Sequence, residues 1–506
     1  MAKITRRNFV KGVAATGAFV CTSGFFSPRQ CLTQTNKSRV FRINHCPVHD
    51  GELRHEGLDT LLDLLAQHGI HLYRTSAIDK WAGPEGLINR DDVVLIKVNC
   101  QWKCRGTTNT DLVRGLVHRI LGHPEGFTGE VVIIENGQGR GGFDGMAGGG
   151  SYGAWSEIAN NVHVNAEEEK VLTIDYLVNT VFVSQRVSSF LLDSIRSKFI
   201  GIDDHTTNGY RRTSDVSYPC FTSAGGNRIE LSEGIWKNGT YNRSRLKLIN
   251  IPVLKDHGGT GITGVLKHVY GILSMDDGSS GIRHYSQSGT QCGKMWSLVR
   301  APDLNILDCL WVSFESLTGY PPETTRRTNM LLAGIDPVAL DYYAAKYIML
   351  PLGGARASEH NPDSFSGLMN HLEGARDFIN AHGGIGGQLT SLGDVNIEVI
   401  TASADGTKPA DTSSGSSGGS GGGACFIATA AYGYRMAEEV VALQRLRDVY
   451  FRNNSFGRSL ILAYYRYSPK LAGLISKSPL MRRAARAALY PLVWVAKALL
   501  PLRHKA

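Results

Sequence analysis

The sequence lacks the patterns that most directly identify a function. Its nine cysteines contain no Cys-x-x-Cys pair, which excludes the usual ferredoxin spacing and the paired-knuckle zinc pattern. No Gly-x-Ser-x-Gly elbow follows a predicted strand, so nothing indicates the nucleophile of an α/β-hydrolase. The function must therefore be inferred from local groupings of polar residues.

Excess positive charge is absent from most of the chain. Residues 425–506 hold fourteen Lys and Arg against three Asp and Glu, whereas the whole chain has a net charge of +9. The residues before this tail are therefore close to neutral, with a net charge of about −2. This distribution argues against a basic nucleic-acid groove in the main domain, so no nucleic-acid partner is expected.

The N-terminus resembles a twin-arginine export signal. Arg6 and Arg7 are followed by Phe9 and Lys11, and a weakly apolar stretch runs over 13–26. Residues 1–30 are therefore predicted to direct the folded chain through the twin-arginine export machinery to an extracytoplasmic location. No Ala-x-Ala cleavage site follows, which favours a segment that is retained as an anchor. A cleaved signal is the alternative.

The main part of the chain alternates short apolar runs with amphipathic stretches. This alternation predicts an α/β domain with a mostly parallel sheet and flanking helices. Strands are expected at 93–96, 131–134, 246–251 and 304–307, with a helix over 112–121. The predicted organisation is an α/β domain over 40–402, a Gly/Ser linker over 403–424, and a separate small α-helical C-terminal domain over 425–506.

The most informative segment places two lysines and a histidine around a Gly/Thr-rich turn. Lys255 and His257 follow an apolar strand, and Lys267 follows the turn at 258–264. Open α/β sheets bind ligands at the carboxyl ends of their strands, and lysine can meet a phosphate or carboxylate. The segment therefore predicts an anion site, although a solvated loop would have the same composition.

Two further patterns have structural and functional interpretations. Gly137 and Gly139 belong to a Gly-x-Gly-x-x-Gly match, but more glycine follows instead of a helix. A loop over the ligand site is therefore favoured over dinucleotide binding. Asp336 precedes Pro337, which predicts an N-cap for a helix running to Tyr347, with ligand binding as the alternative.

Candidate metal ligands are few and the cofactor stays unknown. Cys100 and Cys104 lie four residues apart, and His45 lies near the start of the domain. Together with His257 they could bind a soft metal. A Cys100–Cys104 disulfide and ordinary buried thiols are the alternatives.

Four ordered motifs resemble the family called domain of unknown function 362. They lie at 94–99, 110–113, 255–267 and 333–341, with Val98 and His268 at positions where we expect Pro and Asn. The resemblance extends over about 40–400. It implies a ligand or active site but no particular reaction. The residues of the implied site are Lys97, Asn99, Lys255, His257, Lys267 and Asp336. Members often carry ferredoxin modules, which this chain lacks, so electron transfer is not implied.

The tail resembles the CFI-box C-terminal domain, beginning with Cys425-Phe426-Ile427 directly after the linker. Near its end, three arginines precede a Leu-rich run of about 14 residues that includes Trp494. A bilayer-spanning helix needs roughly 20 residues, so the pattern favours an interfacial helix at a membrane surface. A helical bundle packing on itself or on the main domain is the alternative.

These patterns lead to two hypotheses. In the first, the chain is an extracytoplasmic enzyme acting on a small anionic substrate, with Lys255 and Lys267 binding the anion and His257 acting as general acid or base. In the second, it is a non-catalytic module that binds a metal or an anion at the membrane surface.

Overall fold

The computed structural model describes residues 37–47, 53–102, 105–137, 142–143, 173–192, 207–214, 216–272, 281–407 and 479–499. The predicted export signal, residues 408–424 of the predicted Gly/Ser linker and most of the tail lie outside these residues, as do Cys104 and Gly139. The predicted linker start is one residue early, because Ser403 ends a strand of the main domain. The predictions for those segments therefore remain predictions.

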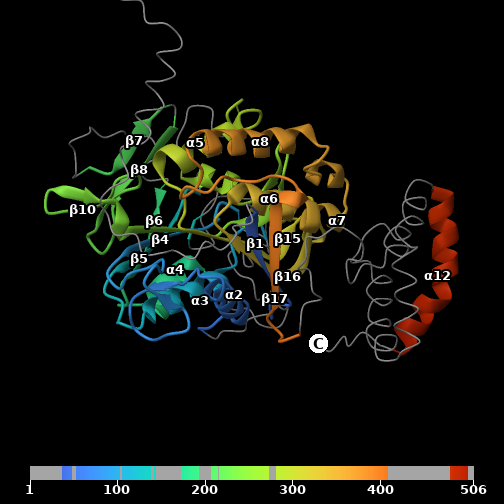
Figure 1. Ribbon diagram of the computed structural model, residues 1–506, viewed down its shortest axis with the longest axis horizontal. Helices are drawn as coiled ribbons and strands as arrows, with labels where there is room; N and C mark the ends of the chain where they lie inside the picture. Colours follow the sequence, from blue (N-terminus) through green and yellow to red (C-terminus); the bar gives the residue numbers. More distant parts are fainter. Residues whose placement is uncertain are drawn as a thin grey trace, which may run out of the picture. The chain divides into compact units, whose positions relative to one another are not determined.

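A large mixed sheet forms the centre of the main domain (Figure 1). Its strand order is β17-β1-β16-β15-β12-β4-β5-β6, and the β13-β14 hairpin joins it through β15. Every neighbouring pair is parallel except those involving β16 and the hairpin itself. The predicted α/β class with a mostly parallel sheet is confirmed. The strands are β1 (Ser38–Asn44), β4 (Val93–Lys97), β5 (Glu130–Glu135), β6 (Val187–Leu191), β12 (Leu246–Asn250), β13 (Val253–His257), β14 (Gly261–Thr263), β15 (Leu304–Ser313), β16 (Thr325–Gly334) and β17 (Ile397–Ser403).

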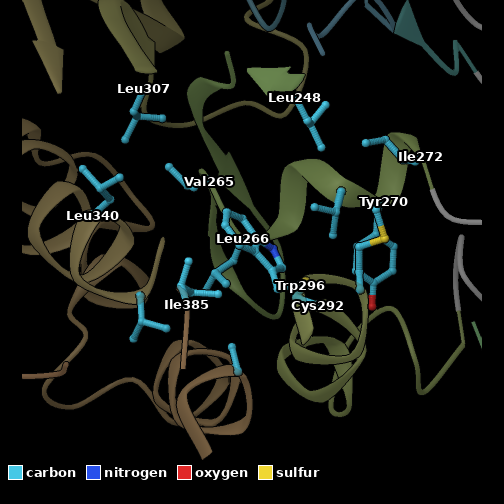
Figure 2. Packing of buried hydrophobic residues seen from close by; sticks show 14 of the residues in the cluster. Leu248, Val265, Leu266, Tyr270, Ile272, Cys292, Trp296, Leu307, Leu340 and Ile385 are labelled. Atoms are coloured by element: carbon cyan, nitrogen blue, oxygen red, sulfur yellow. The ribbon is translucent and has the colours of Figure 1, made fainter. Parts of the chain in front are cut away.

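Alternate residues of the central strands enter two different hydrophobic cores. In β4, Val94 and Ile96 pack with helices α2 (Glu56–Gln67) and α3 (Thr110–Leu121), whereas Val93 and Leu95 belong to the core of the other face. Helices α5 (Ser288–Lys294), α6 (Pro337–Ala344) and α8 (Ser366–Ala381) cover that second face (Figure 1). Figure 2 shows side chains from the sheet, α5 and α6 meeting in this core. Burial on both faces explains why these strands are continuously apolar.

A second, antiparallel sheet lies between β6 and β12 in the sequence, and the sequence analysis did not predict it. Its order is β11-β10-β9-β8-β7, a simple meander. Glu130 at the start of β5 ties it to the large sheet, because its carboxylate accepts hydrogen bonds from Ser188, Ser223, the Gly225 amide and Asn227. The strands are β7 (Gly209–Thr213), β8 (Val216–Thr222), β9 (Arg228–Glu230), β10 (Gly234–Lys237) and β11 (Thr240–Asn242).

The remaining elements are short except for one helix in the tail. Helix α12 spans Pro479–Leu499, and no helix within the described ranges is long and apolar enough to cross a membrane. The short elements are β2 (Tyr73–Arg74), β3 (Ala82–Gly83), α4 (Ile174–Tyr176), η2 (Leu177–Val181), η4 (Arg243–Arg245), η5 (Lys267–Gly271), η6 (Met295–Val299), η7 (Pro322–Thr324), η8 (Ala345–Met349), α7 (Leu350–Leu352), η9 (Ala357–His360) and η10 (Asp394–Asn396).

Candidate functional site

A buried charged cluster lies where parallel strands of the large sheet end. Lys97 is the last residue of β4 and Glu135 the last of the neighbouring β5. Lys255 lies on β13 and is within electrostatic range of both. This is the edge at which open α/β sheets place their ligands, as the sequence analysis expected.

Lys97 is fully buried, and its ammonium group has three partners. It donates to the carbonyl oxygen of Val98 at 2.8 Å, approaches His268 Nε2 at 3.0 Å and forms an ion pair with Glu135. Burial raises the pKa of Glu135 to about 7, while the positive charge of Lys97 opposes that rise. Because an ammonium carries three protons, Lys97 is saturated within the protein.

A chain of side-chain hydrogen bonds holds His268 beside Lys97. Asn250 Nδ2 donates to Asn305 Oδ1 at 3.0 Å, so Asn250 Oδ1 faces His268 Nδ1 at 2.6 Å as an acceptor. His268 therefore donates through Nδ1 and accepts from Lys97 through Nε2. Burial and the nearby lysines hold the pKa of His268 well below its usual range, which agrees with this neutral form.

Close approach explains the glycine that ends η5. A Cβ atom at Gly271 would lie 2.6 Å from both Lys97 Nζ and Glu135 Oε2. Only glycine allows the backbone of this turn to lie against the Lys97–Glu135 pair.

Lys255 has the same side chain as Lys97 but far fewer partners. It is 2% exposed, and within the described ranges its ammonium group donates one hydrogen bond, to the Gly106 carbonyl oxygen at 2.9 Å. Burial lowers the pKa of Lys255 to about 7, although Glu135 opposes the shift. Two of its three donor positions therefore have no acceptor among the described residues.

His257 and Lys267 form the adjoining part of the cluster. His257 Nε2 lies 3.0 Å from His284 Nε2, and its Nδ1 lies 2.7 Å from the Gly258 carbonyl oxygen. Lys267 donates to the backbone carbonyl of His284 at 2.6 Å and lies over the ring of Tyr270. Burial lowers the pKa of Lys267 to about 7, and burial together with Lys267 lowers that of His257 well below its usual range.

The β13-β14 hairpin separates these groups from a second polar cluster. Asp256 alternates with Lys255 and His257 along β13, so its side chain points to the opposite face. There it accepts from Arg356 at 2.8 Å and lies 2.9 Å from His360 Nε2. The stretch predicted as a turn at 258–264 is thus a hairpin whose second strand is β14, with Gly259 and Gly261 at positive φ.

The structure brings Lys97, Lys255, His257 and Lys267 into one cluster, but it places the other predicted ligands in structural roles. Asn99 accepts from the Val253 amide at 3.0 Å and so positions the start of β13. Asp336 is the N-cap of α6, accepting from Val338 and Ala339, and it also accepts from Ser38 and the Ser391 amide. Burial raises the pKa of Asp336 to about 6. Gly137 is buried just after β5.

The candidate metal ligands do not assemble within the described ranges. No group of three or more His, Cys, Asp or Glu side chains there has the arrangement needed to hold a metal ion. His45 pairs instead with Asp405 at 3.2 Å, and its side chain is 65% exposed. Cys100 is buried within electrostatic range of Lys97 and Lys255.

The sequence analysis missed three members of the cluster. Glu135 directly follows the apolar strand at 131–134, so its position at a strand end was a usable signal. His268 was noted only as a departure from the family pattern. His284 lies seventeen residues after Lys267, and no local sequence pattern marks it as a site residue.

Comparisons with known proteins find similarity to one family for part of this region. No curated protein and no solved structure matches the chain. One part of the chain matches a family: it contains Lys255, His257 and Lys267, whereas Lys97, Asn99 and Glu135 lie before it. This part, residues 230–346, matches the family described as Domain of unknown function (DUF362) and is therefore similar to that family.

Proposed function

We propose that the cluster binds a small anionic ligand through Lys255 and Lys267, and that the protein is an enzyme acting on this ligand with His257 as its general acid or base. One observation carries the proposal. Two buried ammonium groups each donate a single hydrogen bond within the described part of the chain. Lys97, in the same cluster, has three partners.

The lysines differ in how fully their buried charges are paired and hydrogen-bonded. A buried charge is costly unless it is paired and hydrogen-bonded. Each hydrogen bond to a charged group contributes about 1.5–3 kcal/mol. A phosphate or carboxylate would supply the acceptors that Lys255 and Lys267 lack, and its negative charge would favour their protonated forms.

The hydrogen bonds of His257 suit it to accept a proton. Its Nδ1 faces a carbonyl oxygen and therefore carries the proton of the neutral ring, which leaves the Nε2 lone pair toward His284. A lowered pKa keeps His257 neutral near pH 7, so the free protein holds it in the form of a base. A bound anion would raise this pKa and make the reverse transfer easier.

The test is binding and turnover of a panel of phosphorylated and carboxylated metabolites. Lys255→Met and Lys267→Met should each weaken binding about tenfold or more, because a charged hydrogen-bonding group is lost. His257→Ala should retain binding but lose turnover. Lys80→Met is the matched control, since Lys80 is exposed and pairs with Asp63 outside the cluster.

The same experiment decides between the enzyme and the binding module. Stoichiometric binding without turnover of any compound would favour a non-catalytic anion-binding protein. Unchanged binding in both lysine variants, with folding verified by circular dichroism, would remove the cluster as the ligand site.

The proposed setting is the outer side of a membrane. The twin-arginine-like start supports export of the folded chain, and replacing Arg6 and Arg7 by lysine should keep the protein in the cytoplasm. Equal export of that variant would contradict this location.

Attachment to the membrane surface is supported by helix α12, where Arg483, Arg486, Tyr490 and Trp494 are all exposed.

A further inference from the structure

We propose a second anion-binding site, at the opposite edge of the large sheet from Lys255. A cavity of about 590 Å³ lies at the amino-terminal ends of the parallel strands. Its lining includes Val93, Glu130 and Val187, which begin β4, β5 and β6. Lys97 and Glu135 end β4 and β5, so the two sites lie on different edges of the sheet.

The antiparallel sheet forms the other wall of this cavity. Lys237 at the end of β10 lines it, together with Gly225 and Asn227 of the turn between β8 and β9. The cavity volume is in the range of sites that hold metabolite-sized ligands, about 300–1,000 Å³.

The carboxylates of the cavity wall are already committed. Glu130 accepts from Ser188, Ser223, the Gly225 amide and Asn227, which fills the four acceptor positions of its carboxylate. Asp91 is paired with Arg245 at 2.5 Å. Within the described residues, neither carboxylate forms an ion pair with Arg186 or Lys237.

Two cationic side chains of the lining are uncommitted. Arg186 and Lys237 are exposed, and neither has an ion pair or a side-chain hydrogen bond with any residue that the structure describes. Arg186 lies in the bend that precedes β6, where its φ is 57°.

The chemistry of the lining indicates the ligand. A guanidinium fork and an ammonium group together suit a small anion with two or more charges on phosphate or carboxylate groups. This inference does not depend on the function proposed for Lys255.

The test uses inorganic pyrophosphate and citrate as probes, titrated calorimetrically at low ionic strength. The full-length Lys255→Met variant serves as the background, in which binding at the first proposed site is already weakened, and the Arg186 and Lys237 replacements identify the part of the binding that belongs to the second site. One equivalent of pyrophosphate or citrate should bind, and adding Arg186→Gln and Lys237→Gln should weaken that binding at least about tenfold. The preferred probe shows whether the site takes a phosphate or a carboxylate.

A matched control separates a site from general charge. Arg212→Gln with Lys80→Gln removes the same two positive charges at exposed positions outside the cavity, and it should leave the binding unchanged. Absence of binding for both probes in the Lys255→Met background would overturn the inference. So would equal losses in the two double-glutamine variants.

Discussion

At the scale of single residues, the contrast between Lys97 and Lys255 defines the site. Both side chains are buried and both feel the charge of Glu135. The Lys97 ammonium group directs its three N–H bonds to Val98, His268 and Glu135, so it organises the cluster. Lys255 retains donor capacity and a pKa of about 7, so its charge is easily altered by a ligand.

His268 gives a test of how the cluster is organised. His268→Ala would leave Lys97 Nζ and Asn250 Oδ1 without this partner in a buried environment. We expect a loss of about 2–4 kcal/mol in the free energy of unfolding, measured by urea denaturation. His268→Asn should cost clearly less, because an amide also offers one acceptor and one donor. Equal costs for the two variants would contradict the role of the hydrogen-bond chain.

At this scale the sequence points to charged residues next to a turn and does not reveal partners that are distant in sequence. Lys255, His257 and Lys267 stay predicted site residues, chosen because lysines and a histidine beside glycines are unusual near a strand end. His284 and Asn305 could not be identified from the sequence, because only the folded chain brings them to His257 and Asn250. The N-cap role of Asp336 was predicted correctly because it depends on neighbouring residues alone.

At the scale of elements, the β13-β14 hairpin carries two residues of the proposed ligand site. Strand alternation puts Lys255 and His257 on one face, while Asp256 fixes the other face to Arg356 and His360. The sequence indicated a loop here because Gly258, Gly259 and Gly261 are typical of turns. Gly261 instead begins β14, where a Cβ atom would lie 2.5 Å from the Glu359 carbonyl oxygen.

Helix α12 is the element through which we expect contact with a membrane. Arg483→Gln with Arg486→Gln should weaken binding of the full chain to anionic lipid vesicles about 30-fold, since each cation near such a surface contributes about 1 kcal/mol. Tyr490→Ser with Trp494→Ser should weaken binding to both anionic and zwitterionic vesicles. Cosedimentation with vesicles measures both effects.

Exposed apolar residues of the main domain supply the control for that experiment. Leu389 and Val395 are 58% and 76% exposed, and replacing both with serine should leave vesicle binding unchanged. Vesicle binding that survives all the α12 replacements would contradict a role for this helix.

At the scale of the whole molecule, the sequence predicted the class of the fold but not its full extent. Continuous apolar runs indicated β4 and β5, because strands buried on both faces carry no alternating pattern, and stretches rich in Leu and Ile indicated β12 and β15. The antiparallel sheet was missed since its strands are short, three to seven residues long, and carry many polar residues. That sheet forms one wall of the second proposed site, which the sequence therefore could not indicate.

At the scale of the whole molecule, we also expect the buried lysines to change their protonation when an anion binds. Lys255 and Lys267 have pKa values of about 7, so near pH 8 they are mostly neutral in the free protein. A bound anion favours the charged form, and the affinity should therefore fall as the pH rises above about 7.

The most direct measurement is the number of protons taken up on binding. It is obtained by calorimetric titration near pH 8 in two buffers of different ionisation enthalpy. The ligand is the tightest-binding carboxylate of the metabolite panel, whose own charge is constant above about pH 6. We predict proton uptake of about two per ligand in the native chain, roughly one for each lysine, and about one per ligand in Lys255→Met. Binding without proton uptake, or the same uptake in Lys255→Met, would contradict the central claim that the buried ammonium of Lys255 receives the anion.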